Sequence, residues 1–277
     1  MVLLSVLWAL VLIGSLTASI VLLARRGFFE TRNRMSLAQA RWALGWCENL
    51  AQSQLEHDST YPGGSARLPN GAWCRIHVTP ANAGFNINTA DGLALQRFFG
   101  SDSVVAAILD WRDADTEARP AGCERTCASA RGIPVPANRG FAQAQAVRQV
   151  RGLQFLSDSA LALLTVTGDG RINPAQAPAA VIGSLPGVSP ALARRIELVA
   201  RAGQITGLAS LAQLAKPMER AELEQWWTDL AARTTFEQGP LVLDAAAGSA
   251  LGPASARERL ILLPSKRGAA VLRREGW

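Results

Sequence analysis

Five carboxylates gather in one short polar segment of this 277-residue chain. The segment DWRDADTEARPAGCE contains Asp110, Asp113, Asp115, Glu117 and Glu124. Carboxylate oxygens from one loop can converge on a hard cation such as Ca²⁺, which takes about six to eight oxygen ligands. The spacing is not that of an EF-hand, because the loop glycine and the closing glutamate are not at the required positions. Two interpretations follow: a calcium site, or the capped and solvated end of a helix.

The four cysteines are the second set of residues with distinctive chemistry. Their number is even, as expected of a protein outside the cytosol, where disulfides form. Cys123 and Cys127 are four residues apart, and a zinc site there would need two further ligands from a chain with only two histidines. A local disulfide is therefore favoured over a metal. Cys47 and Cys74 form either a second disulfide or two buried thiols.

The sequence carries no recognised catalytic motif. It has no GxSxG, no HExxH and no phosphate-binding loop. His57, near a predicted helix end, and His77, in a predicted strand, fit structural positions better than acid–base catalysis. We therefore expect no enzymatic activity, and no cofactor other than calcium.

Residues 2–23 form an apolar run without a single charge. A helix needs about 20 such residues to cross a bilayer. The run begins without the basic n-region of a secretory signal, so a retained membrane helix is predicted. Four arginines follow between residues 25 and 34, and the positive-inside rule would hold them in the cytoplasm. That conflict disappears if a short basic leader once preceded Met1.

The helical pattern continues beyond the apolar run. Apolar residues recur at spacings of two to four at Met35, Leu37, Ala40, Leu44, Cys47, Ala51 and Leu55. This stripe predicts one continuing helix that ends near residue 55, before the breaker at 61–64. Residues 72–79 alternate in polarity and predict a strand. A bond between Cys47 and Cys74 would then tie the helix to the sheet.

Residues 86–233 have a helical pattern with an internal echo. The segment 86–90, NINTA, and the segment 173–175, NPA, each precede a helix that Asp102 or Ser189 can cap. After residue 233, short runs separated by glycine and proline predict strands. The order of elements predicts an α+β domain with a helical domain inserted into its sheet.

The segment SLPGVSPALARRI, at 184–196, has a competing interpretation. Helix-hairpin-helix DNA-binding units contain a Leu-Pro-Gly-hydrophobic-Gly turn whose backbone N–H groups bind a phosphate. Here Ser189 replaces the second glycine, which hinders close approach of a backbone. The net charge of +6 does not decide the question, because the arginines are scattered along the chain.

Taken together, the sequence resembles the large minor pseudopilins of type II (general) secretion, the protein K family. The resemblance covers nearly the whole chain and rests on the order of its motifs rather than on any one of them. The motifs are VLLSVLWALVLIGSL at the start, FNINTA at 85–90, ILDWRDADTEARPAG at 108–122, GDGRIN at 168–173, SLPGVSPALARRI at 184–196, and the strand-rich tail.

The resemblance implies a pilin-like α+β fold, in which a long N-terminal helix packs on a small antiparallel sheet and a large helical domain is inserted between strands. The implied parts are a transmembrane helix at 1–24, its periplasmic continuation at 25–60, a pilin-like α/β domain at 61–85 and 234–277, and the inserted helical domain at 86–233. The protein would cross the bacterial inner membrane once, with its C-terminal bulk in the periplasm.

The implied function is structural. Proteins of this kind form a tip complex with the minor pseudopilins I and J, start the pseudopilus on an inner-membrane assembly platform, and help to export folded proteins across the outer membrane. Contact with secreted substrate is also implied, and no nucleic acid is expected. We expect Leu37, Ala40 and Leu44 to pack against partner helices. The alternatives are a type IV pilus minor pilin and a membrane-anchored helix-hairpin-helix DNA receptor.

Family knowledge also bears on the first residues of the chain. The precursor of such a protein is cleaved and N-methylated by the prepilin peptidase. If Met1 is the mature first residue, Ser5 stands where most pilins carry glutamate, and a carboxylate buried in lipid must find a partner. A tip subunit has no neighbour above it, so the loss of glutamate is favourable there. The alternative is that serine is simply tolerated, because it can bond to its own helix.

Calcium is associated with the helical domain in this family. Members often carry an acidic, aromatic stretch after the Pro-x-Gly-x-Glu segment, whereas here the stretch is Arg125-Thr126-Cys127. A disulfide between Cys123 and Cys127 is therefore an alternative to calcium as the link that stabilises this segment.

Overall fold

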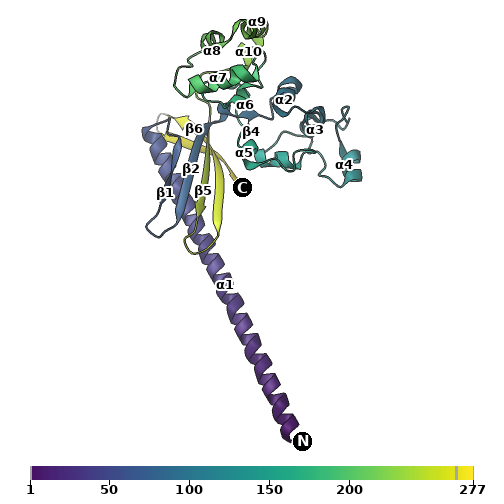
Figure 1. The fold of residues 1–277 in the computed structure, drawn as a ribbon, viewed down its shortest axis with the longest axis vertical. Coiled ribbons are helices and arrows are strands. Elements are labelled where there is room, and N and C mark those ends of the chain that lie inside the picture. Colours follow the sequence, from purple (N-terminus) through teal and green to yellow (C-terminus); the bar gives the residue numbers. More distant parts are fainter. Residues whose placement is uncertain (1, 266–267, 277) are drawn as a thin grey trace. The chain divides into compact units, whose positions relative to one another are not determined.

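The computed structural model describes residues 2–265 and 268–276, with the side chains of residues 2–5, 265, 268 and 276 outside the description. The chain divides into two compact units (Figure 1). The first unit contains the chain up to residue 78 together with residues 243–259 and 276. The second unit contains residues 79–242 and 260–275.

One helix, α1, makes up most of the first unit. It runs without a break from Val2 to His57, over 56 residues. At 1.5 Å per residue its length is about 84 Å. It continues through Gly27 and ends just before the Pro62-Gly63-Gly64 segment, so the predicted continuation of the membrane helix is confirmed.

A stripe of buried residues along α1 packs within the first unit. We call it the inner stripe, and it consists of Ser36, Ala40, Ala43, Leu44, Cys47, Glu48, Ala51 and Leu55. Its many alanines let a backbone approach closely. A disulfide joins Cys47 to Cys74 of β2, with 6.2 Å between the two Cα atoms. Nearer the N-terminus, Gln39 Oε1 accepts hydrogen bonds from Ser249 Oγ at 2.6 Å and from the Ala250 amide at 3.0 Å.

Five strands form one sheet in the order β1-β2-β5-β6-β7. The strands are β1 (Gly63–Arg67), β2 (Trp73–Pro80), β5 (Leu241–Gly248), β6 (Ser255–Ser265) and β7 (Gly268–Gly276). Strand β1 pairs antiparallel with β2. Along β2 the buried residues alternate with exposed ones, as the sequence pattern predicts for a half-buried strand.

Short helices fill the chain between β2 and β5. They are α2 (Gly92–Phe99), α3 (Asp102–Arg112), α4 (Arg125–Arg131), α5 (Asp158–Leu161), α6 (Ala179–Ile182), α7 (Pro190–Ala200), α8 (Leu208–Leu214), α9 (Pro217–Gln225) and α10 (Trp227–Arg233), with 3₁₀ turns η1 (Ala81–Ala83) and η2 (Ala144–Gln149). Strand β3 (Phe85–Asn86) lies parallel to β4 (Leu164–Thr165) in a separate two-stranded sheet. The predicted helical insertion between strands is therefore confirmed.

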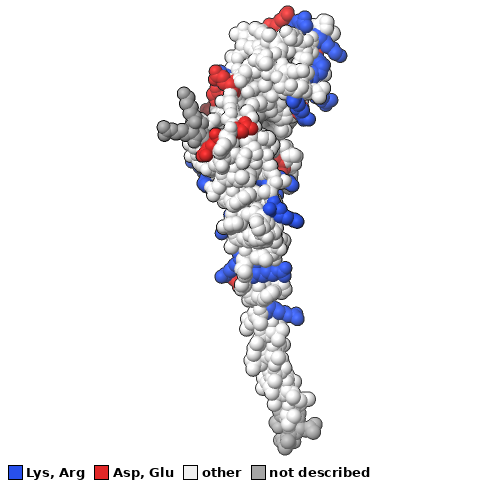
Figure 2. Space-filling model, turned by 90° about the vertical axis from the view of Figure 1, so that its left-hand side faces the viewer, with Lys and Arg blue, Asp and Glu red and all other residues white. Residues whose placement is uncertain are grey.

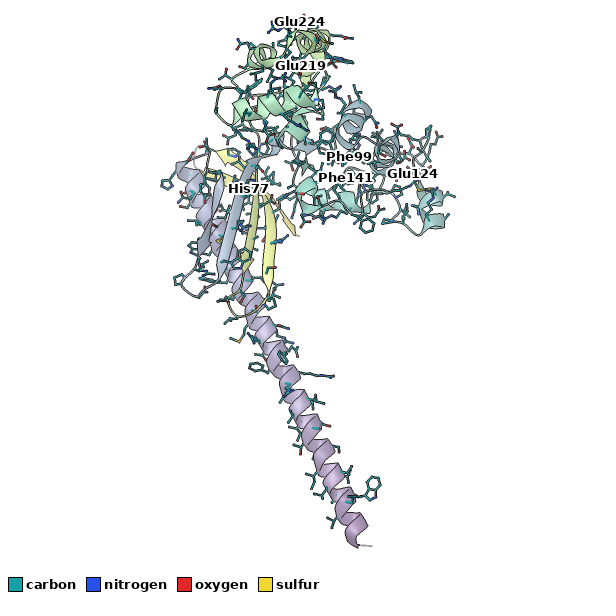
Figure 3. The ribbon with its side chains drawn as sticks, viewed as in Figure 1. His77, Phe99, Glu124, Phe141, Glu219 and Glu224 are labelled. Atoms are coloured by element: carbon teal, nitrogen blue, oxygen red, sulfur yellow. A yellow bond between two sulfur atoms is a disulfide. The ribbon has the colours of Figure 1, made fainter. Side chains whose placement is uncertain are left out.

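Aromatic pairs stabilise the core of this helical region. The rings of Phe85 and Phe98 stack at 4.3 Å, and Phe99 meets Phe98 edge to face at 4.9 Å. The rings of Trp111 and Phe141 stack at 5.8 Å. Figure 3 labels Phe99 and Phe141, which come from α2 and from the loop before η2. Such pairs contribute about 0.5–1.5 kcal/mol beyond the burial of their area.

Of the two residues predicted to cap helices, Ser189 is an N-cap and Asp102 is not. Ser189 is the N-cap of α7, and its Oγ accepts from the Leu192 amide at 3.0 Å, as expected. Asp102 is not a cap. It is the first residue of α3, and Ser101 takes the N-cap position without a side-chain cap bond. A carboxylate in the first turn still interacts favourably with the helix dipole.

Candidate functional site

The N-terminal part of α1 is apolar and unburied. Every described side chain from residue 6 to residue 35 is exposed. Within the described residues, one helix is long and apolar enough to cross a membrane by length and composition. On the face drawn in Figure 2 the part of α1 that follows the grey atoms is white, and blue side chains begin only farther along. These features fit a single-pass anchor. Ser5 lies in α1, but its side chain is outside the described part of the chain.

The structure changes the expected partner interface on α1. Ala40 is 0% exposed and Leu44 is 6% exposed, because both belong to the inner stripe. Side chains covered by their own chain are unavailable to a partner helix, so the expectation is corrected at these two positions. Leu37 lies at the border, 36% exposed, and its contact with a partner stays a prediction.

A different set of α1 side chains faces outward. We call it the outer stripe, and it consists of Phe28, Met35, Trp42 and Trp46, which are 39–64% exposed. Their spacings of seven, seven and four residues place them on one face of a helix with 3.6 residues per turn. By the same periodicity that face is turned away from the inner stripe. In the sequence, these four residues stand out as large apolar side chains in a segment that also carries several arginines, and this contrast could have indicated an interaction surface.

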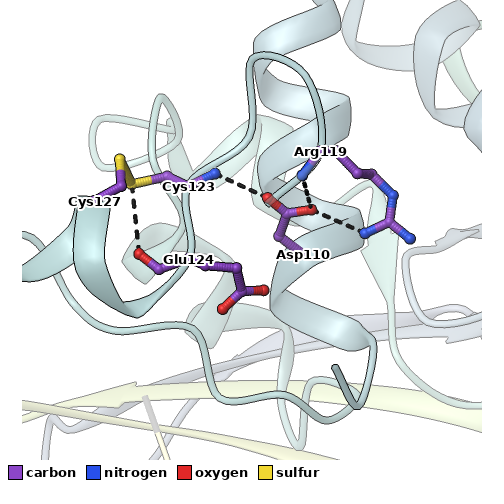
Figure 4. The surroundings of a disulfide bond; sticks show 5 residues. All are labelled: Asp110, Arg119, Cys123, Glu124 and Cys127. Atoms are coloured by element: carbon purple, nitrogen blue, oxygen red, sulfur yellow. Dashed lines mark hydrogen bonds and ion pairs between the residues drawn. A yellow bond between two sulfur atoms is a disulfide. The ribbon is translucent and has the colours of Figure 1, made fainter. Parts of the chain in front are cut away.

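The carboxylate of Asp110 lies buried at the end of α3 and is enclosed by N–H donors. Asp110 is 0% exposed. Its Oδ1 accepts from Arg119 Nη1 at 2.9 Å and from the Arg119 amide at 3.3 Å, and its Oδ2 accepts from the Cys123 amide at 2.9 Å (Figure 4). The same Arg119 nitrogen pairs with Asp113. The pKa of Arg119 is raised by its hydrogen bonds to Asp113 and Asp110.

A tight turn brings these donors to Asp110. The Gly122 amide donates to the Arg119 carbonyl at 2.8 Å, which closes the turn over Pro120 and Ala121. Ala121 has φ +66°, the left-handed region that the third position of a type II turn requires. A Cβ at Gly122 would overlap Asp110 Oδ2, so only glycine fits there. Sequence reasoning missed Arg119 and Gly122, although both lie in the ARPAG motif.

The other three acidic residues of the segment have distinct surroundings. Asp115 and Glu117 are exposed, and Asp115 Oδ1 accepts the Glu117 amide at 2.9 Å. Glu124 is only 5% exposed, and its Oε1 has no hydrogen-bond partner in the described part of the chain. Its pKa is raised, first by burial and then by the charge of Asp110.

The donor set has the right chemistry for calcium, but its arrangement does not fit an ion. Carboxylate oxygens suit Ca²⁺, and the buried Oδ1 of Asp113 and Oε1 of Glu124 are unpartnered. However, the oxygens of Asp110 already accept N–H bonds, and a guanidinium lies between Asp110 and Asp113. Among the described residues, no three His, Cys, Asp or Glu side chains group closely enough to hold a metal. Calcium binding by the predicted five residues stays untested.

All four cysteines are paired. Cys123 and Cys127 are bonded across the start of α4, with 5.3 Å between their Cα atoms, and Cys47 and Cys74 are bonded as described above. The structure therefore contains the favoured Cys123–Cys127 bond and, of the two alternatives for Cys47 and Cys74, the disulfide. The histidines make no pair: His57 is exposed in the last turn of α1, and His77 is exposed on β2 (Figure 3).

The hairpin before α7 is closed by protein groups. Gly187 has φ +70° and packs on α9, where an added Cβ would lie 3.0 Å from the Glu222 carbonyl oxygen. At the N-terminus of α7, the Ser189 hydroxyl donates to Glu219 Oε1 at 2.8 Å. Figure 3 labels Glu219 on α9. A carboxylate that pairs with Arg195 therefore already occupies the cap of α7, next to the backbone amides that would bind a phosphate.

The repeated asparagines have a structural role. Asn86 Oδ1 accepts the amide of residue 88 at 3.0 Å, and Asn173 Oδ1 accepts the amide of residue 175 at 3.0 Å, so both form the same Asx turn. Asn88 adds bonds to both backbone groups of Phe141. The shortened second copy thus keeps the turn and lacks the counterpart of Asn88.

Comparison with solved structures gives matches to several chains, one of which is described here. No protein-family model matches the sequence, and no curated protein matches it either. The chain is similar to one chain in the crystal structure of the GspK-GspI-GspJ complex from the enterotoxigenic Escherichia coli Type 2 Secretion System. The TM-score is 0.65 at 17% sequence identity, and the match covers 90% of this chain and 99% of that one. At this identity the match shows the fold, and the expected α+β fold, with a long N-terminal helix packed on a small antiparallel sheet and a helical insertion between strands, is confirmed.

Proposed function

We propose that the protein is a minor pseudopilin of type II secretion that caps the tip of the pseudopilus and starts its assembly. The outer stripe of α1 carries this proposal. One side of the helix is covered by its own sheet. On the outer stripe, Trp42 and Trp46 are exposed, and Phe28 and Met35 are exposed but also line a hollow with Ala250 and Leu251 of the same chain. Exposed apolar surface of this kind marks an interaction site.

The size of the outer stripe suits a helix-packing interface. From the exposed fractions of its four side chains, it offers roughly 400–500 Å² of apolar surface, and burial would contribute on the order of 10 kcal/mol before the entropic cost of association. The aromatic and methionine side chains are those enriched in interface cores. Packing of α1 helices side by side would cover the stripe.

The membrane segment supports the same role. Residues 2–23 would anchor the subunit in the bacterial inner membrane, with the rest of the chain in the periplasm. The proposal includes removal of a short basic leader by the prepilin peptidase, with N-methylation of the new first residue, because such a leader would resolve the conflict between this orientation and the arginines that follow the apolar run. If Met1 is the mature first residue, Ser5 stands in place of the usual glutamate, which suits a subunit without a neighbour above it. Two disulfides agree with an oxidising compartment.

The proposed partners are the counterparts of the two other proteins in the similar complex. We propose that the chain binds minor pseudopilins I and J through α1, and that the three subunits together engage the assembly platform in the inner membrane. The resulting pseudopilus would push folded proteins across the outer membrane. Binding of secreted substrate by the helical insertion is a further part of this proposal.

A matched pair of variants tests the partner interface. The full-length chain is produced in membranes with its I and J pseudopilins and purified in mild detergent. Trp42→Arg puts a charge in the outer stripe, and Leu198→Arg makes the same type of change on α7, where Leu198 is 71% exposed. We expect about tenfold less co-purified I and J with Trp42→Arg than with Leu198→Arg. Equal recovery with both variants would contradict the proposed interface.

A further inference from the structure

Arg119 is shared between two carboxylates at the end of α3. Its guanidinium pairs with Asp110, which is fully buried, and with Asp113, whose side chain is 19% exposed. The Arg119 side chain itself is 38% exposed. A single positive charge thus lies between two negative charges that are three residues apart, Asp110 in the last turn of α3 and Asp113 at its C-cap. Charge-assisted bonds of this type are stronger than neutral ones.

The bonds to Asp110 also connect two separate segments. The Arg119 amide and the Cys123 amide both donate to the buried carboxylate, so the loop from 119 to 123 is fastened to the end of α3. A divalent cation bound by carboxylates from both segments would make the same connection. In this protein the N–H groups of Arg119 and Cys123 make the connection, and they already occupy the Asp110 oxygens that such an ion would need.

The disulfide completes the connection. Cys123 supplies the amide that donates to Asp110 Oδ2, and its side chain is bonded to Cys127 in the first turn of α4 (Figure 4). The bridge therefore holds the donating amide next to the start of α4. Gly122 leaves room for the approach, because any Cβ there would overlap the carboxylate.

From this geometry we propose that Arg119 is the internal counter-cation of Asp110 and Asp113. The segment from Asp110 to Cys127 is then held by this arginine and by the Cys123–Cys127 disulfide, and it folds without a bound calcium ion. The inference does not depend on the proposed function, because it concerns the stability of one segment in the isolated chain.

The proposal predicts how the Arg119→Ala variant behaves. In that variant Asp110 and Asp113 would lose the guanidinium that they share, and Oδ1 of Asp113 and Oε1 of Glu124 already have no hydrogen-bond partner among the described residues. Three carboxylates in this state repel one another and offer only oxygen ligands. Arg119→Ala is therefore expected to loosen the segment. In the folded arrangement no three acidic side chains of the described residues group closely enough to hold a metal, so the response to calcium expected of this variant comes from carboxylates that the loosened segment allows to converge on the ion.

The test compares hydrogen exchange of residues 108–128 in the full-length, oxidised protein in detergent, with excess EDTA or with excess CaCl₂. In the wild type we expect the same exchange in both. In Arg119→Ala we expect exchange about tenfold faster in EDTA, and a return toward the wild-type rate in CaCl₂. Arg131→Ala is the control, because it removes an exposed arginine at the end of α4 and is expected to behave as the wild type.

Two results would overturn the proposal. One is wild-type exchange that slows about tenfold when CaCl₂ replaces EDTA, which would show that the segment needs the ion. The other is Arg119→Ala exchange equal to that of Arg131→Ala in EDTA, which would show that the arginine does not hold the segment. If Arg119→Ala fails to fold, Arg119→Lys keeps the positive charge without the planar guanidinium, and the wild-type comparison still decides the calcium question.

Discussion

Substitution of the buried carboxylate is the sharpest test of the segment between α3 and α4. Asp110→Asn keeps the size of the side chain and keeps Oδ1 as an acceptor for Arg119. It replaces Oδ2 with an NH₂ group, which faces the Cys123 amide across 2.9 Å. One hydrogen bond to a charged acceptor is lost, and the Cys123 amide is left without its partner. The ion pair with Arg119 is lost as well.

The size of the effect follows from these losses. A hydrogen bond to a charged group contributes about 1.5–3 kcal/mol, and breaking a buried ion pair costs about 3–5 kcal/mol. The two estimates overlap, because they count the same carboxylate. Since Arg119 is 38% exposed and keeps Asp113, we expect a loss of about 3 kcal/mol in the free energy of unfolding of the second unit.

The assay is urea-dependent hydrogen exchange of peptides from the second unit, which reports the opening free energy of that unit. The control is Asp115→Asn, an equal change at an exposed aspartate of the same segment, for which we expect less than about 0.5 kcal/mol. If Asp110→Asn costs no more than Asp115→Asn, the carboxylate does not fasten the loop and the reasoning fails.

Three further predictions concern charge and cross-links. Glu124→Gln should raise the free energy of unfolding at neutral pH. Burial raises the pKa of Glu124 in the folded state, so the ionised side chain destabilises the protein above that pKa. Urea unfolding at a series of pH values should show that the gain from Glu124→Gln disappears in acid. The Arg233 hydrogen bond lowers the pKa of Asp91, so this pair stabilises the fold above the unfolded pKa of about 3.9, and its contribution is lost as pH falls through the folded pKa. Arg233→Ala should flatten that acid limb by less than about 1 kcal/mol, because both side chains are partly exposed. Replacing Cys47 and Cys74 with serine should lower the free energy of unfolding of the first unit by about 3 kcal/mol, because their bond closes a loop between residues 27 apart in sequence. An unchanged urea midpoint of unfolding would show that the bond does not stabilise this unit.

The sequence was informative where one strong local signal sufficed. An uncharged apolar run followed by a helical stripe predicted α1, and alternating polarity predicted β2. The turn residues around 61–64 marked the end of the helix. Ser189 was recognised as a cap because serine before a proline-initiated helix is a specific pattern. In each case neighbours in sequence determine the local structure.

The partner-facing side of α1 could not be predicted in the same way. The helix carries apolar residues on two faces, and periodicity does not say which of them the sheet covers. Ala40 and Leu44 were therefore assigned to a partner, although the sheet side buries them. Trp42 and Trp46 were left out because they fall between the positions of that stripe. Only the tertiary structure separates the two faces.

The carboxylate segment shows a second limit of sequence reasoning. Spacing brought Asp110, Asp113 and Glu124 to attention, but it does not reveal that a turn returns Arg119 to the same place. That return depends on the left-handed backbone of Ala121 and on the room left by Gly122. Arg119 follows Asp110 by nine positions, a spacing that neither helix nor strand periodicity relates to a contact. Only the folded structure therefore shows that Arg119 pairs with Asp110 and Asp113.

The mass of the complex with partner pseudopilins tests the central claim most directly. The full-length chain is produced together with its I and J pseudopilins, purified in detergent, and measured by multi-angle light scattering. A single species with one copy of each subunit is the predicted result, and Trp42→Arg should separate it into its components. Three independent species with the wild-type chain, each well folded, would contradict the assignment as a tip pseudopilin.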